Sequence, residues 1–90
     1  MMEQKTDFII IGASILDVLA QPVSAEVFET GSVSAEHTAM HTGGDALNEA
    51  AVLAALGASV RLVSKVGSDY AGNYIQNYCQ RAGMDTSFLQ

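Results

Sequence analysis

The hydrophobic and polar positions divide the chain into short strand-like runs and longer helical stretches. Residues 8–11 are continuously apolar and end at Gly12, which is typical of a strand buried on both faces of a parallel sheet. Residues 60–67 alternate between two faces and predict a second strand. Residues 84–89 predict the start of a third strand.

Two stretches between these runs follow a helical period. Residues 45–56 are rich in alanine, leucine and glutamate, and their apolar positions surround most of the helix, which predicts packing between the sheet and other elements. Residues 70–82 carry apolar positions at helical spacing, with Ser68 or Asp69 as the N-cap. A glycine follows each stretch, as is usual just beyond a helix end. Strand, helix, strand, helix, strand predicts an α/β fold with a parallel sheet.

The connection between the first strand and the first helix is unusually long. Residues 18–42 alternate loosely between apolar and polar positions and indicate exposed strands, with a turn near residues 26–31. Connections in such units usually have roughly 2–6 residues. We therefore predict one domain over residues 1–90, with residues 18–42 inserted as a flap over the site.

Size and charge narrow the classes of function. Ten acidic residues against four basic ones give a net charge of −6, which repels phosphate backbones and anionic lipid, so neither nucleic acid nor a membrane is an expected partner. No apolar run approaches the roughly 18 residues of a membrane span, and the first residues lack the pattern of a signal peptide. The single Cys79 cannot form an intrachain disulfide. These features favour a cytoplasmic protein.

Gly43 and Gly44 stand immediately before the first helix. Because they lack Cβ atoms, their backbone N–H groups can approach a ligand, and the helix start adds unpaired donors and a positive dipole end. Such a site suits hydroxyl groups or anions, although a plain loop before a helix also explains the pair. Asp17 is predicted just beyond the carboxyl end of the first strand, where α/β sheets place ligand crevices, unless it only forms a turn.

Two polar residues follow the glycines. Asn48 lies in the first helical turn, where its amide can point back towards the glycines or serve as a local cap. Asp45 is predicted to be the N-cap, with any ligand contact secondary. Nucleotide fingerprints do not accompany them, since no Gly-Lys-Ser/Thr follows and residues 12–17 lack the second and third glycines of the dinucleotide motif.

The remaining candidate groups favour structural roles. His37 and His41 are separated by about 13 Å on an extended strand, which is too far to share a metal ion, so we predict no metal site. Cys79 lies in the apolar stripe of the second helix and is predicted to be a buried, inert thiol.

Three segments together carry a family resemblance. Residues 43–50 (Gly-Gly-Asp-Ala-Leu-Asn-Glu-Ala), residues 56–57 (Leu-Gly) and residues 66–72 (Val-Gly-Ser-Asp-Tyr-Ala-Gly) closely resemble the first motif of the PfkB (ribokinase-like) carbohydrate kinases. The resemblance covers nearly all of this chain but only the amino-terminal part of a family member. It implies a Rossmann-like three-layer α/β/α fold with a parallel central sheet, partial here, and a β lid that residues 18–42 match.

The resemblance also implies a reaction and its cofactors. Family members transfer the γ-phosphoryl group of ATP to a sugar hydroxyl, so ATP and Mg²⁺ are expected for the complete enzyme and a small sugar is the expected partner. Carried over by position, Asp17 would bind substrate hydroxyls, and Gly43 and Gly44 would offer backbone donors. Asn48 would bind a further hydroxyl, with Asp45 beside it.

Departures from the family pattern limit what this segment does alone. Ile15 and Asp45 replace the Asn and Lys of members that prefer ribose, so a plain ribokinase is not expected. The family's Gly-Ala-Gly-Asp motif, which supplies the anion hole and the catalytic Asp, does not occur in residues 1–90. We therefore assign no catalytic residue and no ATP site here, and expect an inactive, truncated segment.

Two alternatives stay open. Exposed lid strands can pair between chains, which would give a homodimer and a non-catalytic oligomerisation or regulatory module. The apolar residues Ile15, Leu16 and Met40 are also compatible with a nucleoside substrate, as in an adenosine-type kinase.

Overall fold

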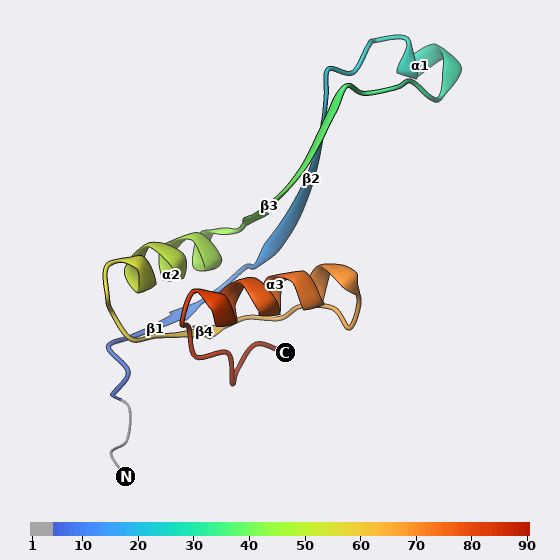
Figure 1. The fold of residues 1–90 in the computed structure, drawn as a ribbon. Helices are drawn as coiled ribbons and strands as arrows, with labels where there is room; N and C mark the ends of the chain where they lie inside the picture. The colour runs from blue at the N-terminus through green and yellow to red at the C-terminus, as the bar shows by residue number, and fades with distance from the viewer. Residues whose placement is uncertain (1–4) are drawn as a thin grey trace.

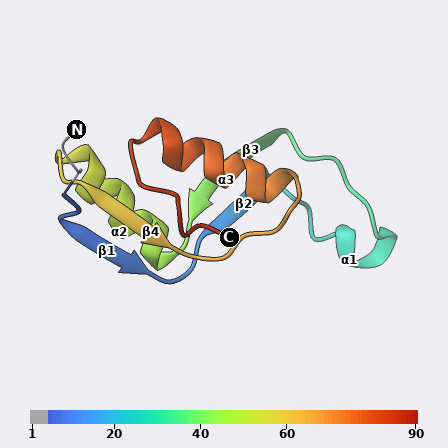
Figure 2. The same ribbon diagram turned by 90° about the horizontal axis from the view of Figure 1, so that it is seen from below.

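The computed structural model describes residues 5–90, which fold around a parallel pair of strands (Figure 1). Strands β1 (Phe8–Ile11) and β4 (Val60–Val63) pair along their whole length. Helices α2 (Asp45–Ala55) and α3 (Tyr70–Arg81) both lie on the same side of this pair, as the two views show (Figure 2). The predicted α/β class with a parallel sheet is confirmed.

The core forms where the two helices meet the inner face of the strand pair. Val60 and Leu62 alternate with more exposed residues of β4 and are almost completely buried, as the period of a strand requires. The alanines of α2 allow this helix to approach the sheet closely. The other buried residues are Ala46, Leu47, Ala50, Ile75, Cys79, Met84 and Leu89.

The outer face of β1 differs from the prediction. Ile9 and Ile11 are 56% and 74% exposed, although a continuously apolar run predicted burial on both faces. Only Ile10 of this strand's isoleucines packs against the core, because within residues 5–90 both helices cover the same face. Val52 of α2 and Leu56, the C-cap residue of this helix, are likewise exposed. The apolar pattern is typical of a sheet that is covered on both faces. Within residues 5–90, helices cover only one face of the strand pair.

A long antiparallel hairpin leaves this α/β unit and gives the molecule an extent of 61 Å in its longest direction (Figure 1). It consists of β2 (Ile15–Gln21) and β3 (His37–Gly43), with the short helix α1 (Val27–Thr30) at its tip. The hairpin begins before the predicted flap boundary, so its base includes Asp17. We call residues 15–43 the lid hairpin.

The carboxyl-terminal segment does not form the predicted third strand. Its backbone pairs with β4 and the residue after it only through isolated bridges, from Arg61 to Asp85 and from Ser64 to Leu89, and Arg61 also forms an ion pair with the Asp85 carboxylate. Between these bridges Asp85 Oδ1 accepts a hydrogen bond of 2.9 Å from the Ser87 backbone N–H. This side-chain bond forms a local turn that interrupts regular pairing.

The helix ends agree with the sequence except at one position. Asp69 is the N-cap of α3, as predicted, and its Oδ1 accepts a 2.9 Å bond from the Gly72 N–H. Glycines 57 and 83 follow the last turns of α2 and α3. The predicted N-cap of α2 is wrong, however: Gly44 takes that place and Asp45 is the first helical residue. Strand β3 continues through Gly43, so only Gly44 remains to make the turn.

Candidate functional site

The candidate site is built where the lid hairpin joins the first large helix. Strand β3 ends at Gly43 and α2 begins at Asp45, so Gly44 alone changes the chain direction, with φ +94°. A Cβ at Gly44 would lie 2.5 Å from the carbonyl oxygen of Ala13. The same oxygen accepts a 3.3 Å bond from the Leu47 N–H. The start of α2 is therefore fastened to the β1–β2 connection, which only a glycine permits.

Asp17 lies inside β2 and not in a loop after β1, which corrects its predicted position. Its pairing partner across the lid hairpin is His41. The carboxylate leans towards the helix start, since a Cβ at Gly43 would lie 3.0 Å from Asp17 Oδ2. The tertiary structure thus brings the predicted carboxylate against the predicted glycine pair.

The two faces of the lid hairpin differ near its base. Leu16 packs against the core, so this face of β2 is turned towards the helices. Asp17 is the next residue and points to the opposite face, where its side chain is exposed. The candidate site therefore opens on the side of the hairpin that is turned away from the core of residues 5–90.

The other two predicted residues occupy different places on α2. Asp45 is exposed at the first helical position, beside the N–H groups that have no acceptor within a helix. Asn48 donates its backbone N–H to the Gly44 carbonyl over 2.9 Å, and its side chain is exposed. It borders an apolar hollow of about 450 Å³ together with Glu49, Val52 and Leu53. Within residues 5–90 no hydrogen bond joins the Asn48 amide to Asp17.

This arrangement combines an acceptor with donors. The Asp17 carboxylate accepts hydrogen bonds, whereas the start of α2 presents backbone N–H groups. A hydroxyl group can donate to the first and accept from the second. A nucleotide phosphate fits poorly, because Asp17 and Asp45 place two carboxylates at this helix start. The described residues at this position therefore suit a polyhydroxylated ligand better than a nucleotide phosphate.

The second glycine-rich segment has a structural role. A Cβ at Gly72 would lie 1.8 Å from the Gly67 carbonyl oxygen, so the first turn of α3 sits directly on the preceding loop. The Asp69 cap closes the same turn. These contacts explain the spacing of the motif over residues 66–72 without a ligand.

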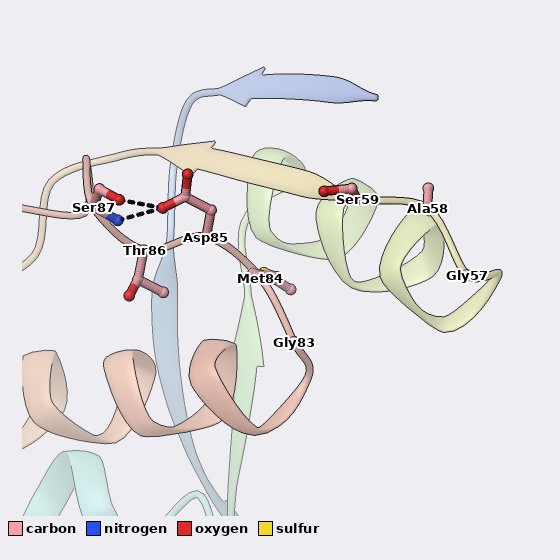
Figure 3. Close-up of a pocket in the computed structure, with 8 residues that line it drawn as sticks. All are labelled: Gly57, Ala58, Ser59, Gly83, Met84, Asp85, Thr86 and Ser87. Carbon is pink, nitrogen blue, oxygen red and sulfur yellow. Dashed lines mark hydrogen bonds between the residues drawn. The ribbon is translucent and has the colours of Figure 1, made fainter. Parts of the chain in front are cut away.

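A separate polar hollow of about 580 Å³ lies beyond the ends of α2 and α3, next to the residues that precede β4 (Figure 3). Asp85 dominates it, but its carboxylate is already engaged by the Ser87 hydroxyl, the Ser87 N–H and Arg61. The Ser87 bonds, with Arg61, lower the pKa of Asp85 to about 2. This hollow is remote from Gly43, and its acidic group holds its own loop together.

Two residues at the lid base carry no sequence signal that assigns them to the site. His41 is one of them, because only the register of the hairpin pairs it with Asp17. Ser14 lies between β1 and β2, and its Oγ is buried without a hydrogen-bond partner in residues 5–90. A short hydroxyl in a loop carries no sequence signal that distinguishes it from an ordinary turn residue.

The described residues offer neither a reactive thiol nor a cluster of metal ligands. Cys79 is fully buried, as predicted, and burial raises the pKa of its thiol to about 11. Across residues 5–90, three or more His, Cys, Asp or Glu side chains do not gather as a metal ion would need. None of the helices in the described part of the chain is long and apolar enough to cross a membrane.

An α/β unit with an inserted lid hairpin, and an aspartate beside a glycine pair at the lid base, matches a known class of protein. Residues 5–90 match the family described as pfkB family carbohydrate kinase, and the chain belongs to this family. A 5-dehydro-2-deoxygluconokinase from Lacticaseibacillus casei is 34% identical over 86 residues, which cover 96% of this chain and 25% of that protein.

Solved structures show the same ribokinase-like fold. The crystal structure of a PfkB protein from Polaromonas sp. JS666 matches with a TM-score of 0.78 and 29% identity, covering 94% of this chain and 26% of that one. The fructokinase from Xylella fastidiosa matches with a TM-score of 0.74 and 29% identity, covering 91% and 23%. The chain spans about a quarter of the length of these relatives.

Proposed function

We propose that residues 1–90 form the sugar-binding and lid part of an ATP-dependent carbohydrate kinase, which transfers the γ-phosphoryl group of ATP to a sugar hydroxyl. The observation that carries this proposal is the position of Asp17 Oδ2, 3.0 Å from the Cβ position of Gly43, the last residue of β3 before the turn into α2. A sugar hydroxyl placed there meets an acceptor and backbone donors together.

Each residue has a distinct role in this proposal. Asp17 binds the hydroxyl groups most strongly, because hydrogen bonds to an ionised group are roughly twice as strong as neutral ones. Gly44 keeps the backbone at the helix start accessible to the sugar, and the buried Gly43 leaves room for the Asp17 carboxylate. Asn48 offers an amide one turn further along α2. Asp45 stands exposed at the rim, at the first position of α2.

The lid hairpin excludes water from the bound sugar. Water competes with the sugar as phosphoryl acceptor, so a cover over the site prevents wasteful hydrolysis. Asp17 and Gly43 belong to the base of the hairpin, which means that any movement of the lid also moves two of the binding groups. Closing of the lid hairpin and positioning of the sugar-binding groups are therefore coupled.

The relatives suggest the substrate class. One is named a 5-dehydro-2-deoxygluconokinase and another a fructokinase. Both names refer to six-carbon compounds, and we propose a hexose or a hexose-derived acid as the acceptor. The catalytic base and the residues that bind ATP and Mg²⁺ would lie outside residues 1–90. We therefore expect no phosphoryl transfer from this chain alone.

Sugar binding is tested by NMR titration of the ¹⁵N-labelled chain with fructose, gluconate and adenosine. We expect weak, saturable shifts centred on residues 43–48, and a dissociation constant that rises roughly tenfold in Asp17→Asn, because one charge-assisted hydrogen bond is lost. Glu29→Gln is the matched control, since it removes the same charge from the lid tip. Equal affinities for Asp17→Asn and the unaltered chain would refute the proposal, and selective adenosine binding would favour a nucleoside kinase.

A kinase assay of the 90-residue chain with ATP and a sugar panel tests whether residues 1–90 bind the sugar without catalysing phosphoryl transfer. We expect no product. Clear turnover would show that the base and the ATP site lie within residues 1–90.

One observation favours a second function, a homodimer or regulatory module formed through the lid hairpin. Phe28 is 91% exposed at its tip, and Val18 and Leu19 are exposed along β2. Apolar strands of this kind pair readily with another copy. Light scattering with and without sugars separates the two functions, because a stable dimer that ignores sugars favours the module.

A further inference from the structure

His41 stands directly across the lid hairpin from Asp17. In an antiparallel pair, residues opposite each other place their side chains on the same face. His41 is exposed, and within residues 5–90 no hydrogen bond or ion pair engages its imidazole. An acceptor-only carboxylate and an imidazole with an N–H donor therefore lie side by side at the candidate site.

The same face continues away from the helix start. Positions two apart on a strand share a face, so Leu19 and Ala39 follow Asp17 and His41, and Gln21 and His37 follow in turn. A hollow of about 200 Å³ runs along these residues from His41 to His37. A ligand bound at Asp17 has room to extend past His41 along this hollow.

His41 is one of two basic residues in the strands of the lid hairpin. Neither β2 nor β3 contains lysine or arginine, so the histidines are their only residues with a basic side chain. Hydroxyl groups satisfy Asp17 by donating to it. A carbonyl or carboxylate oxygen cannot donate and needs a donor, which His41 offers next to Asp17.

We propose that His41 is a specificity-determining residue of the sugar site. It donates a hydrogen bond to a carbonyl or carboxylate oxygen of a ligand whose neighbouring hydroxyl groups bind Asp17. The site thereby distinguishes sugar acids and keto sugars from simple polyols. This inference rests on the proposed sugar-binding function and adds the chemical group that the site recognises.

The test compares D-gluconate with D-glucitol, which differ only in a carboxylate or a hydroxymethyl group at C1. NMR titration gives the ratio of the two dissociation constants for each variant. We expect His41→Ala to lower the preference for gluconate at least threefold, and His41→Gln, which keeps an N–H donor, to restore part of it. Val18→Ala changes the opposite lid face and should leave the ratio unaltered. Retained spectral dispersion shows that each variant is folded.

The outcomes separate this inference from the proposed function. An unchanged ratio in His41→Ala overturns the inference, while weaker binding of both ligands to Asp17→Asn still supports the sugar site. If the unaltered chain binds neither ligand, the sugar site and the role of His41 both fall. If Val18→Ala lowers the preference for gluconate as much as His41→Ala does, the role of His41 is also overturned. The effect would then not depend on which face of the lid hairpin carries the substitution.

Discussion

Replacing Gly44 by alanine tests whether the candidate site depends on the close contact at the start of α2. Gly44 has φ +94° and ψ 142°, a backbone conformation outside the left-handed helical region that costs an L-residue roughly 1–3 kcal/mol. The new Cβ would also lie 2.5 Å from the Ala13 oxygen and 2.9 Å from its carbonyl carbon. Because both atoms are backbone, the strand connection has to move, and such overpacking costs about 1–3 kcal/mol. The expected total loss of unfolding free energy is about 2–6 kcal/mol.

Gly57→Ala is a control for the part of this free-energy loss that comes from backbone strain. Gly57 also has φ +94°, but nothing lies within 4 Å of its Cβ position. This variant should lose about 1–2 kcal/mol from backbone strain alone. The difference between the two variants therefore reports the crowding of Gly44 against Ala13 together with the backbone strain of the extended ψ at Gly44.

Urea and thermal denaturation followed by circular dichroism give both values. A loss of 1 kcal/mol lowers the melting temperature of a domain this size by roughly 4–8 °C, so Gly44→Ala should melt roughly 5–20 °C below Gly57→Ala. Equal melting temperatures would refute the reasoning, because they would show that the β1–β2 connection yields to the added methyl group at no cost.

Three further predictions concern α3 and the carboxyl-terminal segment. Asp69→Ala should destabilise the fold by about 1 kcal/mol in urea denaturation because the N-cap bond to Gly72 is lost, whereas an equal loss in Asp69→Asn, which keeps an acceptor, would contradict the capping role. The thiol of Cys79, with its pKa raised to about 11 by burial, should react with a thiol reagent at pH 8 only after urea unfolds the chain, and rapid labelling of the native state would contradict its burial. The pKa of Asp85 falls from 3.8 to about 2 on folding, so its contribution is present above pH 4 and disappears as the pH falls towards 2. The unaltered chain should therefore exceed Asp85→Asn in urea midpoint by more at pH 6 than at pH 2, and a constant difference would contradict this.

Local sequence determined the helices and most of their ends. The apolar period of residues 70–82 and the acceptor side chain of Asp69 act within one or two turns, so they can be recognised without the fold. The alternation along residues 60–67 predicted a strand with two distinct faces for the same reason, and Val60 and Leu62 are buried together on one of them. The motif over residues 43–50 likewise indicated the family that the comparisons confirm.

Errors arose where a local pattern depends on distant partners. Asp45 has the residue type of an N-cap, but β3 extends to Gly43 and leaves Gly44 to cap the helix. Residues 84–89 have the composition of a strand, yet the Asp85 turn interrupts their pairing with β4. Ile9 and Ile11 are apolar enough to be buried, but burial also requires a covering layer.

The sequence by itself determined which polar and glycine residues the site would contain, while the tertiary structure decided how they face one another. Side chains alternate along a strand whatever its partner, but the register of a hairpin sets which residues lie opposite each other. The pairing of β2 with β3 places His41 beside Asp17 and brings the Asp17 carboxylate against Gly43. Residues separated by more than twenty positions in the chain become neighbours only through that register, so no local pattern could have revealed the pair.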